Sequence, residues 1–356
     1  MTHQRHPAGR IALGMSGGVD SAVSAALLMR AGYDVVGITC RFQDNVAADC
    51  AAADAAAVCA LLGIPHVERL CVAGFEREVV QPFADAYIQG LTPSPCVGCN
   101  AGCKLPGLLE AAEELGCDGV ATGHYARIAQ LVDSGRFAVL TALDARKDQS
   151  YMLSLLSQDQ LSRLVLPLGG TTKTEVRILA ADLGLPVAEK PESQDVCFID
   201  GDYRTFLSQR GVTDEPGLIV DRTGKVLGHH EGLSGFTIGQ RKGIGIAAPE
   251  PYYVVEKRVD SRELVVGYAS DAQVVSVRLG KVNWQAITCL EGPEDASVKL
   301  RYRSTPAPCI MEPEPEGGVR VVLRSPQPTT APGQFAVFYR GSTVLGGGMI
   351  EEVSSV

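Results

Sequence analysis

The string Gly-Met-Ser-Gly-Gly-Val-Asp-Ser at residues 14–21 follows a short apolar run and precedes an alanine-rich stretch with helical spacing. The apolar run, residues 11–14, predicts a first strand, and residues 21–31 predict a helix. A glycine-rich turn between a strand and a helix directs backbone N–H groups at a bound phosphate beside the positive end of the helix. The sequence therefore predicts an α/β domain with a phosphate-binding loop at its first turn.

Strand-like and helix-like segments go on alternating through the first half of the chain. Residues 34–41, 66–72 and 119–123 predict further strands, residues 51–62, 75–88 and 108–115 predict helices, and residues 128–143 predict a hairpin that turns at 133–135. Such alternation is typical of a parallel sheet wrapped by helices. The fold class we expect is α/β, with an N-terminal doubly wound parallel sheet.

Beyond about residue 200 the sequence changes to short alternating segments separated by glycine and proline turns. Residues 252–256, 274–279, 297–302, 319–323 and 334–339 predict antiparallel strands of a small C-terminal β-barrel. Residues 221–245, rich in glycine and polar residues, predict a small linking module. We expect a catalytic domain at 1–200, a central domain at 201–265 and the barrel at 266–356.

Composition limits the class of protein. Apolar residues make up 46% of the chain and charged residues 21%, which is typical of a folded globular protein. The formal charge of −9 argues against a surface that is basic throughout, but a local basic patch can still bind nucleic acid. Residues 11–15 form an apolar run too short for a signal peptide or a membrane span, so we expect a cytoplasmic protein without membrane contact.

The glycine-rich string is neither a Walker A loop, because no Gly-Lys-Ser/Thr follows, nor a GxGxxG motif. The alternative is a glycine-rich turn that binds nothing. The carboxylate of Asp20 is unexpected beside phosphates unless a magnesium ion or the loop itself accounts for it. The string resembles the PP-loop of the ATP-pyrophosphatases, and that resemblance implies cleavage of ATP between its α- and β-phosphates with transfer of AMP to an oxygen of the substrate.

Eleven cysteines in a chain of 356 residues are more typical of buried thiols, metal ligands or catalysis than of a disulfide framework. Residues 92–100 contain Cys96 and Cys99 and predict a loop, because two prolines oppose a helix. A CxxC there is consistent with redox chemistry, metal binding or sulfur handling. Cys103 is either an extra ligand or a packed thiol, and Cys197 alone reads as a core residue.

From end to end the chain resembles the tRNA-specific 2-thiouridylases. The matching strings are GMSGGVDS (14–21), TPSPCVGCN (92–100), ATGHYAR (121–127), KDQSYML (147–153), LGGTTKTEVR (168–177), ESQDVCFI (192–199), GFTIGQRKG (235–243), VKLRYR (298–303) and PGQFAVFY (332–339). The resemblance implies that the wobble uridine of tRNA is adenylated on its C2 oxygen, which makes that oxygen a good leaving group, and that sulfur then replaces it.

The resemblance also implies roles for individual residues. Cys197 is expected to carry a persulfide delivered by a sulfur-relay protein, and Cys99 to act as the nucleophile that resolves it through a transient disulfide. ATP, with Mg²⁺, is expected to contact Gly14, Met15, Ser16, Gly17, Gly18, Val19, Asp20, Ser21, Gly123 and the backbone of Cys40.

The same resemblance implies contacts with the anticodon loop of tRNA. The expected substrates are the tRNAs that accept glutamate, glutamine and lysine. The target base is expected at Ser94, Pro95 and Cys96, and the remaining tRNA contacts at Lys147, Asp148, Gln149, Arg301 and Tyr302. The last two residues offer a phosphate clamp and a stacking face. His124 is assigned no catalytic role.

Three alternatives stay open. Some family members have aspartate where this chain has Cys96. The first alternative is that Cys96, Cys99 and Cys197 are ligands of a [4Fe-4S] cluster. A PP-loop enzyme with another substrate, such as a cluster-dependent tRNA thiolase or a small-molecule amidating synthetase, would share the first motif. A zinc-stabilised RNA-binding module is the non-enzymatic alternative.

Overall fold

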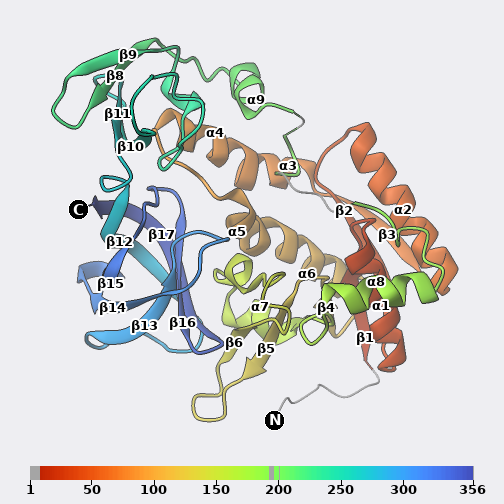
Figure 1. Cartoon of the computed structure of the whole chain (residues 1–356). Helices are drawn as coiled ribbons and strands as arrows, with labels where there is room; N and C mark the ends of the chain where they lie inside the picture. Colours follow the sequence, from red (N-terminus) through yellow and green to blue (C-terminus); the bar gives the residue numbers. More distant parts are fainter. Residues whose placement is uncertain (1–8, 192–195, 200, 356) are drawn as a thin grey trace.

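The computed structural model describes residues 9–191, 196–199 and 201–355 (Figure 1). The first half of the chain forms a five-stranded parallel sheet in the order β3-β2-β1-β4-β7. Its strands are β1 (Arg10–Gly14), β2 (Asp34–Arg41), β3 (His66–Leu70), β4 (Gly119–Ala121) and β7 (Leu164–Val165). The strand order reverses beside β1, so the predicted doubly wound sheet is confirmed, and ligands bind such sheets at this reversal.

Helices cover both faces of this sheet because the residues of β1 alternate between two cores. Ile11 and Leu13 pack with α1 (Val19–Arg30), α2 (Val46–Leu62) and α8 (Lys173–Asp182), whereas Ala12 packs with α6 (Leu105–Glu114). The burial of alternate strand residues against different helices is what a sheet sandwiched between two helical layers requires.

Two continuous helical runs contain a π-helical stretch, and each stretch ends just before a proline. The first run is α3 (Val72–Phe75), the π-helix η1 (Glu76–Val80) and α4 (Gln81–Ile88), which contains Pro82; the second is α5 (Pro95–Cys99), the π-helix η2 (Asn100–Lys104) and α6, which contains Pro106. A proline inside an α-helix clashes with the carbonyl four residues earlier, and the wider π-turn relieves that clash.

The loop predicted at residues 92–100 is therefore wrong in its second half. Pro95 occupies the first turn of α5, where a proline costs no hydrogen bond, and Ser94 is the residue that precedes the helix. Helix α5 places Cys96 and Cys99 on regular helical geometry and runs on through η2 into α6.

The C-terminal strands close a six-stranded antiparallel barrel, as predicted. The strands are β12 (Gln273–Trp284), β13 (Glu294–Lys299), β14 (Ala307–Pro313), β15 (Val319–Pro328), β16 (Phe335–Arg340) and β17 (Thr343–Ser355), and β12 pairs with both β15 and β17. The strand expected at 297–302 ends at Lys299, which leaves Arg301 and Tyr302 in a turn.

The predicted hairpin also exists, and it extends the barrel sheet rather than the parallel sheet. Strands β5 (Ala126–Gln130) and β6 (Phe137–Thr141) join it where Thr343 pairs with Leu140. The guanidinium of Arg136 donates to the carbonyl oxygens of Trp284 and Gln285, both at 2.7 Å. These bonds attach the barrel firmly to the catalytic half of the chain.

In the sequence, a four-stranded sheet in the order β10-β11-β8-β9 lies between these two parts, and it stands at the upper left of Figure 1. Its strands are β8 (Gly217–Asp221), β9 (Val226–His230), β10 (Tyr253–Arg258) and β11 (Glu263–Gly267).

Short helices complete the chain: η3 (Ser150–Leu153), α7 (Gln158–Arg163), α9 (Tyr203–Gln209), η4 (Leu233–Gly235) and η5 (Pro315–Gly317). Within the described ranges, every helix is too short or too polar to cross a bilayer.

Candidate active site

The glycine-rich string forms a tight loop between β1 and α1. Gly17 has φ +67°, and a Cβ there would lie 2.3 Å from the carbonyl oxygen of Ala51 in α2, so both the backbone conformation and the close approach require glycine. Gly18 precedes α1, and among the described residues no side chain caps this helix. Its first N–H groups are therefore open to an anion such as a pyrophosphate.

The ends of β2 and β4 flank the loop. Met15 donates its N–H to the carbonyl oxygen of Ile38 at 2.7 Å, and Thr39 Oγ1 donates back to the carbonyl oxygen of Met15 at 3.1 Å. On the other side, a Cβ on Gly123 would lie 3.1 Å from the backbone nitrogen of Ser21. The loop thus sits where the strand order reverses. Residues predicted to contact ATP, at the ends of three strands, lie around it.

The carboxylate of Asp20 is held by two side chains that the sequence alone did not assign. Lys173 Nζ lies 2.6 Å from Asp20 Oδ1, and the hydroxyl of Tyr125 donates to the same oxygen at 2.7 Å. Lys190 Nζ donates to the carbonyl oxygen of Gly17 at 2.9 Å and pairs with Asp54. Lysines from two distant segments therefore converge on the loop.

A cavity of about 510 Å³ opens beside the loop. Its lining combines the phosphate loop, the end of β2, the residue after β4 and the segment around Cys197, and includes Met15, Ser16, Asp20, Ser21, Cys40, Lys104, Gly123, His124, Gln149 and Cys197. The structure therefore brings Cys197 and the predicted nucleotide loop into one cavity, although they are far apart in the sequence.

His124 contributes a neutral imidazole to this cavity. Burial, with a smaller effect from the charge of Lys104, lowers the pKa of His124 to about 3. Its Nδ1 lies 2.8 Å from the hydroxyl oxygen of Thr122. At neutral pH the ring is therefore uncharged, so it can form hydrogen bonds but is not the imidazolium that would act as a general acid.

The thiols of Cys99 and Cys103 lie in a buried aromatic cluster that also contains Phe198, the neighbour of Cys197. Val196 and Ile199 pack against the same cluster, and the amide of Gln43 donates to the carbonyl oxygen of Phe198 at 3.4 Å. The turn that carries Cys197 is thereby fixed beside α5. Cys197 itself is exposed and lines the cavity, whereas Cys99, the thiol predicted to react with it, is buried in the adjacent cluster.

Among these thiols, Cys99 is the most acidic. A hydrogen bond from Cys103, reinforced by the charge of Lys104 and opposed by burial, lowers the pKa of Cys99 to about 7. Burial, followed by the charge of Cys99, raises the pKa of Cys197 to about 11. Although part of the Cys197 side chain touches solvent, dense protein around its sulfur accounts for that rise. Of these three thiols, Cys99 is therefore the one with a substantial thiolate fraction at neutral pH.

A second thiol pair borders the cavity. Cys40 at the end of β2 hydrogen-bonds to Cys71, which follows β3, and this bond together with burial raises the pKa of Cys40. The same bond lowers the pKa of Cys71 to about 7. The sequence alone did not predict this pair. The two cysteines meet only because β2 and β3 pair in a register that places Cys40 opposite Arg69, close to Cys71.

The residues predicted to meet the target base lie where α5 faces the barrel. Ser94 and Pro95 open the helix and Cys96 is exposed on its first turn. Just before them, the N–H of Thr92 donates to the carbonyl oxygen of Pro332 at 2.9 Å, and Gln334 donates to the carbonyl oxygen of Thr92 at 2.8 Å. Figure 1 shows α5 between the barrel and the helices of the parallel sheet.

The predicted tRNA residues at 147–149 occupy different environments. Asp148 is buried, accepts bonds from Ala142 and Ser150, and pairs with Lys299 of the barrel at 3.3 Å. Gln149 lines the cavity, and its side-chain oxygen accepts the N–H of Tyr125. Lys147 is half-buried. Asp148 therefore links two domains here, and its contact with tRNA stays a prediction.

Arg301 and Tyr302 lie beyond β13, near the central sheet. Arg301 donates to the carbonyl oxygen of Ile238 at 2.8 Å, and the ring of Tyr302 lies 6.0 Å from that of Tyr151. Both side chains are half-buried. Their predicted contacts with tRNA stay predictions as well.

The candidate iron–sulfur ligands do not form a ready site. Among the residues that the structure describes, no three histidine, cysteine or acidic side chains are grouped to hold a metal ion. Cys99 faces the aromatic cluster while Cys96 and Cys197 are exposed. Of the string at 192–199, residues 192–195 lie outside the described ranges.

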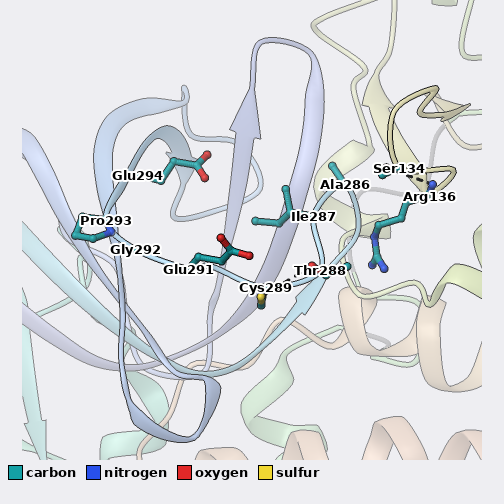
Figure 2. Close-up of a pocket in the computed structure, with 10 residues that line it drawn as sticks. All are labelled: Ser134, Arg136, Ala286, Ile287, Thr288, Cys289, Glu291, Gly292, Pro293 and Glu294. Carbon is teal, nitrogen blue, oxygen red and sulfur yellow. Dashed lines mark hydrogen bonds between the residues drawn. The ribbon is translucent and has the colours of Figure 1, made fainter.

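A second cavity, of about 440 Å³, lies between the hairpin turn and residues 286–294 of the barrel (Figure 2). Two of its charged residues are engaged elsewhere, because Arg136 bonds to backbone carbonyls and Glu294 pairs with Arg340. Cys289 lines this cavity, remote from the phosphate loop. We assign no chemistry to it.

Family models match nearly the whole chain. Residues 9–201 match the tRNA methyl transferase HUP domain, residues 204–268 its PRC-barrel domain, and residues 274–350 the aminomethyltransferase beta-barrel domain. Together with the doubly wound sheet and the loop at its first turn, these matches define an ATP-using enzyme of the PP-loop class.

Relatives narrow the class to one family. The tRNA-specific 2-thiouridylase MnmA of Nostoc punctiforme is 43% identical over 350 residues, which span 97% of this chain and 99% of that protein. That of Chloroflexus aurantiacus is 45% identical over 358 residues, spanning 96% and 98%. The chain belongs to the MnmA family of tRNA-specific 2-thiouridylases.

One solved structure that the fold resembles is the U34-tRNA thiolase NcsA of Methanococcus maripaludis with its [4Fe-4S] cluster. The match covers 59% of this chain and 67% of that one, at 19% identity and a TM-score of 0.35. A likeness this low supports no argument about a cluster in this chain.

Proposed function

We propose that this protein converts the wobble uridine of tRNA to 2-thiouridine in an ATP-dependent reaction. The observation that carries the proposal is that the phosphate loop, Lys104 and Cys197 line one cavity, while Cys99 packs in the cluster that contains Phe198, the neighbour of Cys197. ATP bound at the PP-loop would supply AMP, and a persulfide on Cys197 in the same cavity would supply sulfur. The family to which the chain belongs supports the same substrate.

ATP fits the loop, because Gly17 and Gly18 leave the N–H groups of α1 open to its phosphates. Mg²⁺ fits beside it, since one or two carboxylates together with substrate phosphates are a usual magnesium site and Asp20 is at hand. Mg²⁺ would neutralise phosphate charge there. Lys173 and Tyr125 hold the Asp20 side chain in position for this role.

In the first half-reaction, the C2 oxygen of the uridine attacks the α-phosphate of ATP, and pyrophosphate leaves. In the second, the terminal sulfur of a persulfide on Cys197 attacks C2 and AMP departs with the oxygen. The Cys99 thiolate then attacks the Cys197 sulfur, which breaks the persulfide S–S bond. The thiolated base is released, and a Cys99–Cys197 disulfide remains.

We expect three further segments to bind tRNA, and one of them, residues 147–149, contributes Gln149 to the lining of this cavity. Ser94, Pro95 and Cys96 belong to the wall that α5 forms toward the barrel, and Arg301 and Tyr302 belong to the turn after β13. We propose that the anticodon loop enters between the parallel sheet and the barrel, with a persulfide-donating protein approaching the exposed Cys197. The catalytic, central and barrel domains would divide at about residues 200 and 265.

The test is mass analysis of tRNA nucleosides after incubation with ATP, magnesium and a persulfide donor, together with measurement of AMP and pyrophosphate. We expect 2-thiouridine with the wild-type protein and none with Cys197→Ser. Cys289→Ser is the matched control, because Cys289 is also exposed but lines the remote second cavity. Undiminished 2-thiouridine from Cys197→Ser would refute the role proposed for this thiol.

A further inference from the structure

Cys96 and Cys99 are placed as a dithiol with one accessible and one buried member. Both lie on α5, three residues apart, and Cys96 is exposed whereas Cys99 is 8% exposed. Residues three apart share one side of a helix, with Cβ atoms about 5–6 Å from each other. A disulfide needs about 3.5–4.5 Å.

The segment between the two cysteines permits that small approach. A Cβ on Gly98 would meet no atom of the described structure within 4 Å, and the same is true of Gly102 one turn later. Glycine adjusts its backbone more freely than any other residue. The side chain of Cys96 is itself exposed, so a second molecule can approach it from solvent.

The proposed reaction leaves Cys99 bonded to Cys197, and this disulfide must be reduced before Cys197 can accept sulfur again. The side chain of Cys99 is only 8% exposed, so a soluble dithiol, which is larger than a simple alkylating reagent, reaches its sulfur poorly. A reductant that attacked Cys197 instead would occupy the thiol that has to receive the next persulfide. A thiol on the protein that attacks Cys99 avoids both problems.

We propose that Cys96 is the resolving thiol of Cys99. The Cys96 thiolate attacks the sulfur of Cys99, the Cys99–Cys197 bond breaks, and Cys197 leaves as a thiolate that takes a proton from solvent. A Cys96–Cys99 disulfide results. A soluble dithiol then reduces it, is itself oxidised, and returns both cysteines to thiols. The inference rests on the proposed function.

Local charge and burial favour Cys96 over the other nearby thiol. Burial raises the pKa of Cys96 and of Cys197, and the positive charge of Lys104 opposes that rise in both, while it adds to the lowering of the pKa of Cys99. Cys103 donates a hydrogen bond to Cys99, which together with burial raises the pKa of Cys103 far above its usual range. Cys103 is 8% exposed, so it is both protonated and inaccessible to a reductant.

The first test is one turnover of the wild-type protein loaded with persulfide on Cys197, with ATP and tRNA but without reductant. The reaction is acid-quenched, and differential alkylation locates the disulfide. We expect Cys96 linked to Cys99 and Cys197 free to be alkylated. In Cys96→Ser the Cys99–Cys197 link should become the dominant species. A wild-type protein with Cys99 linked to Cys197 or to Cys103, and Cys96 alkylated, would overturn the inference.

A second test separates this inference from the proposed function. Cys197→Ser cannot carry a persulfide, yet mild oxidation of this variant by an oxidised dithiol should link Cys96 to Cys99, and excess reduced dithiol should reverse it. Cys103→Val in the same background is the matched control and should keep the link. If Cys96 and Cys99 both stay alkylatable, the inference fails even where 2-thiouridine forms. If the link forms but the wild type yields no 2-thiouridine, the proposed function fails instead.

Discussion

The ammonium group of Lys173 lies 2.6 Å from Oδ1 of Asp20, which is 153 residues earlier in the chain. Lys173 is the first residue of α8, whose N-terminus is fixed by a reciprocal capping box between Thr172 and Glu175. The ion pair therefore ties a rigid helix to the phosphate loop. It also accounts for an acidic residue in a loop that has to bind a polyanion.

Replacement of Lys173 by methionine should weaken ATP binding. Without the ammonium group, the carboxylate of Asp20 keeps its negative charge beside the phosphates and loses its main anchor. We expect the KM for ATP in pyrophosphate release to rise about tenfold, which corresponds to about 1.4 kcal/mol. Lys281→Met, on the exposed side of β12, is the control. Equal KM values for the two variants would contradict the role of Lys173.

The reactivity of Cys99 should follow pH with a midpoint near its pKa of about 7. Because this pKa is lowered, the thiolate is present above pH 7 and is lost as the pH falls through it. Alkylation of Cys99 by iodoacetamide, located by peptide mass analysis, should therefore be about tenfold slower at pH 6 than at pH 8. Alkylation of the exposed Cys197, whose pKa is raised to about 11, should instead go on rising with pH above pH 8.

Cys103→Val should move that midpoint upward, because the hydrogen bond from Cys103 is the largest cause of the lowered pKa. Lys104→Met should move it in the same direction by removing the nearby positive charge. A midpoint that stays near pH 7 in both variants would show that neither group controls the thiolate.

Gly17→Ala should abolish pyrophosphate release, because the new Cβ would lie 2.3 Å from the carbonyl oxygen of Ala51 and the backbone has φ +67°. Gly63→Ala is a closely matched control, since Gly63 has φ +70° but a Cβ there meets no atom of the described structure within 4 Å. The control should lose only about 1 kcal/mol of unfolding free energy and keep its activity. Similar activities would mean that the close contact is not needed.

Asp148→Ala should destabilise the protein by about 3 kcal/mol, because it leaves the half-buried ammonium group of Lys299 without its carboxylate partner. Asp295→Ala removes the exposed pair with Arg324 and should cost less than about 1 kcal/mol. Urea denaturation of both variants measures the difference. If Asp148→Ala instead leaves stability unchanged while tRNA binding falls, Asp148 acts on tRNA and not as a link between domains.

The sequence predicted the architecture because each element has a local signal. The loop at residues 14–21, the alternation of strands and helices and the barrel strands all depend on short-range periodicity. The loop predicted around Cys96 was wrong, since proline is also well suited to the first turn of a helix. Choosing between the two required knowing what packs against Val97, which is fully buried.

The arrangement of the site was harder to predict. The contacts of Lys173 and Lys190 with the loop, and of Cys40 with Cys71, join segments that only tertiary folding brings together. Lys173 stands in a string at 168–177 that carries the family resemblance, yet the string alone indicates no partner. The hydrogen bond between Cys99 and Cys103 follows from helical geometry, which the predicted loop had excluded.

The most direct test of the central claim follows a heavy isotope of sulfur placed as a persulfide on Cys197. A single turnover with tRNA is run with and without ATP, and the tRNA nucleosides are analysed by mass. We predict labelled 2-thiouridine at the wobble position with ATP and none without it. Two results would contradict the claim that the PP-loop and Cys197 act together in one cavity. One is label that stays on the protein when ATP is present, and the other is label that reaches the base without ATP.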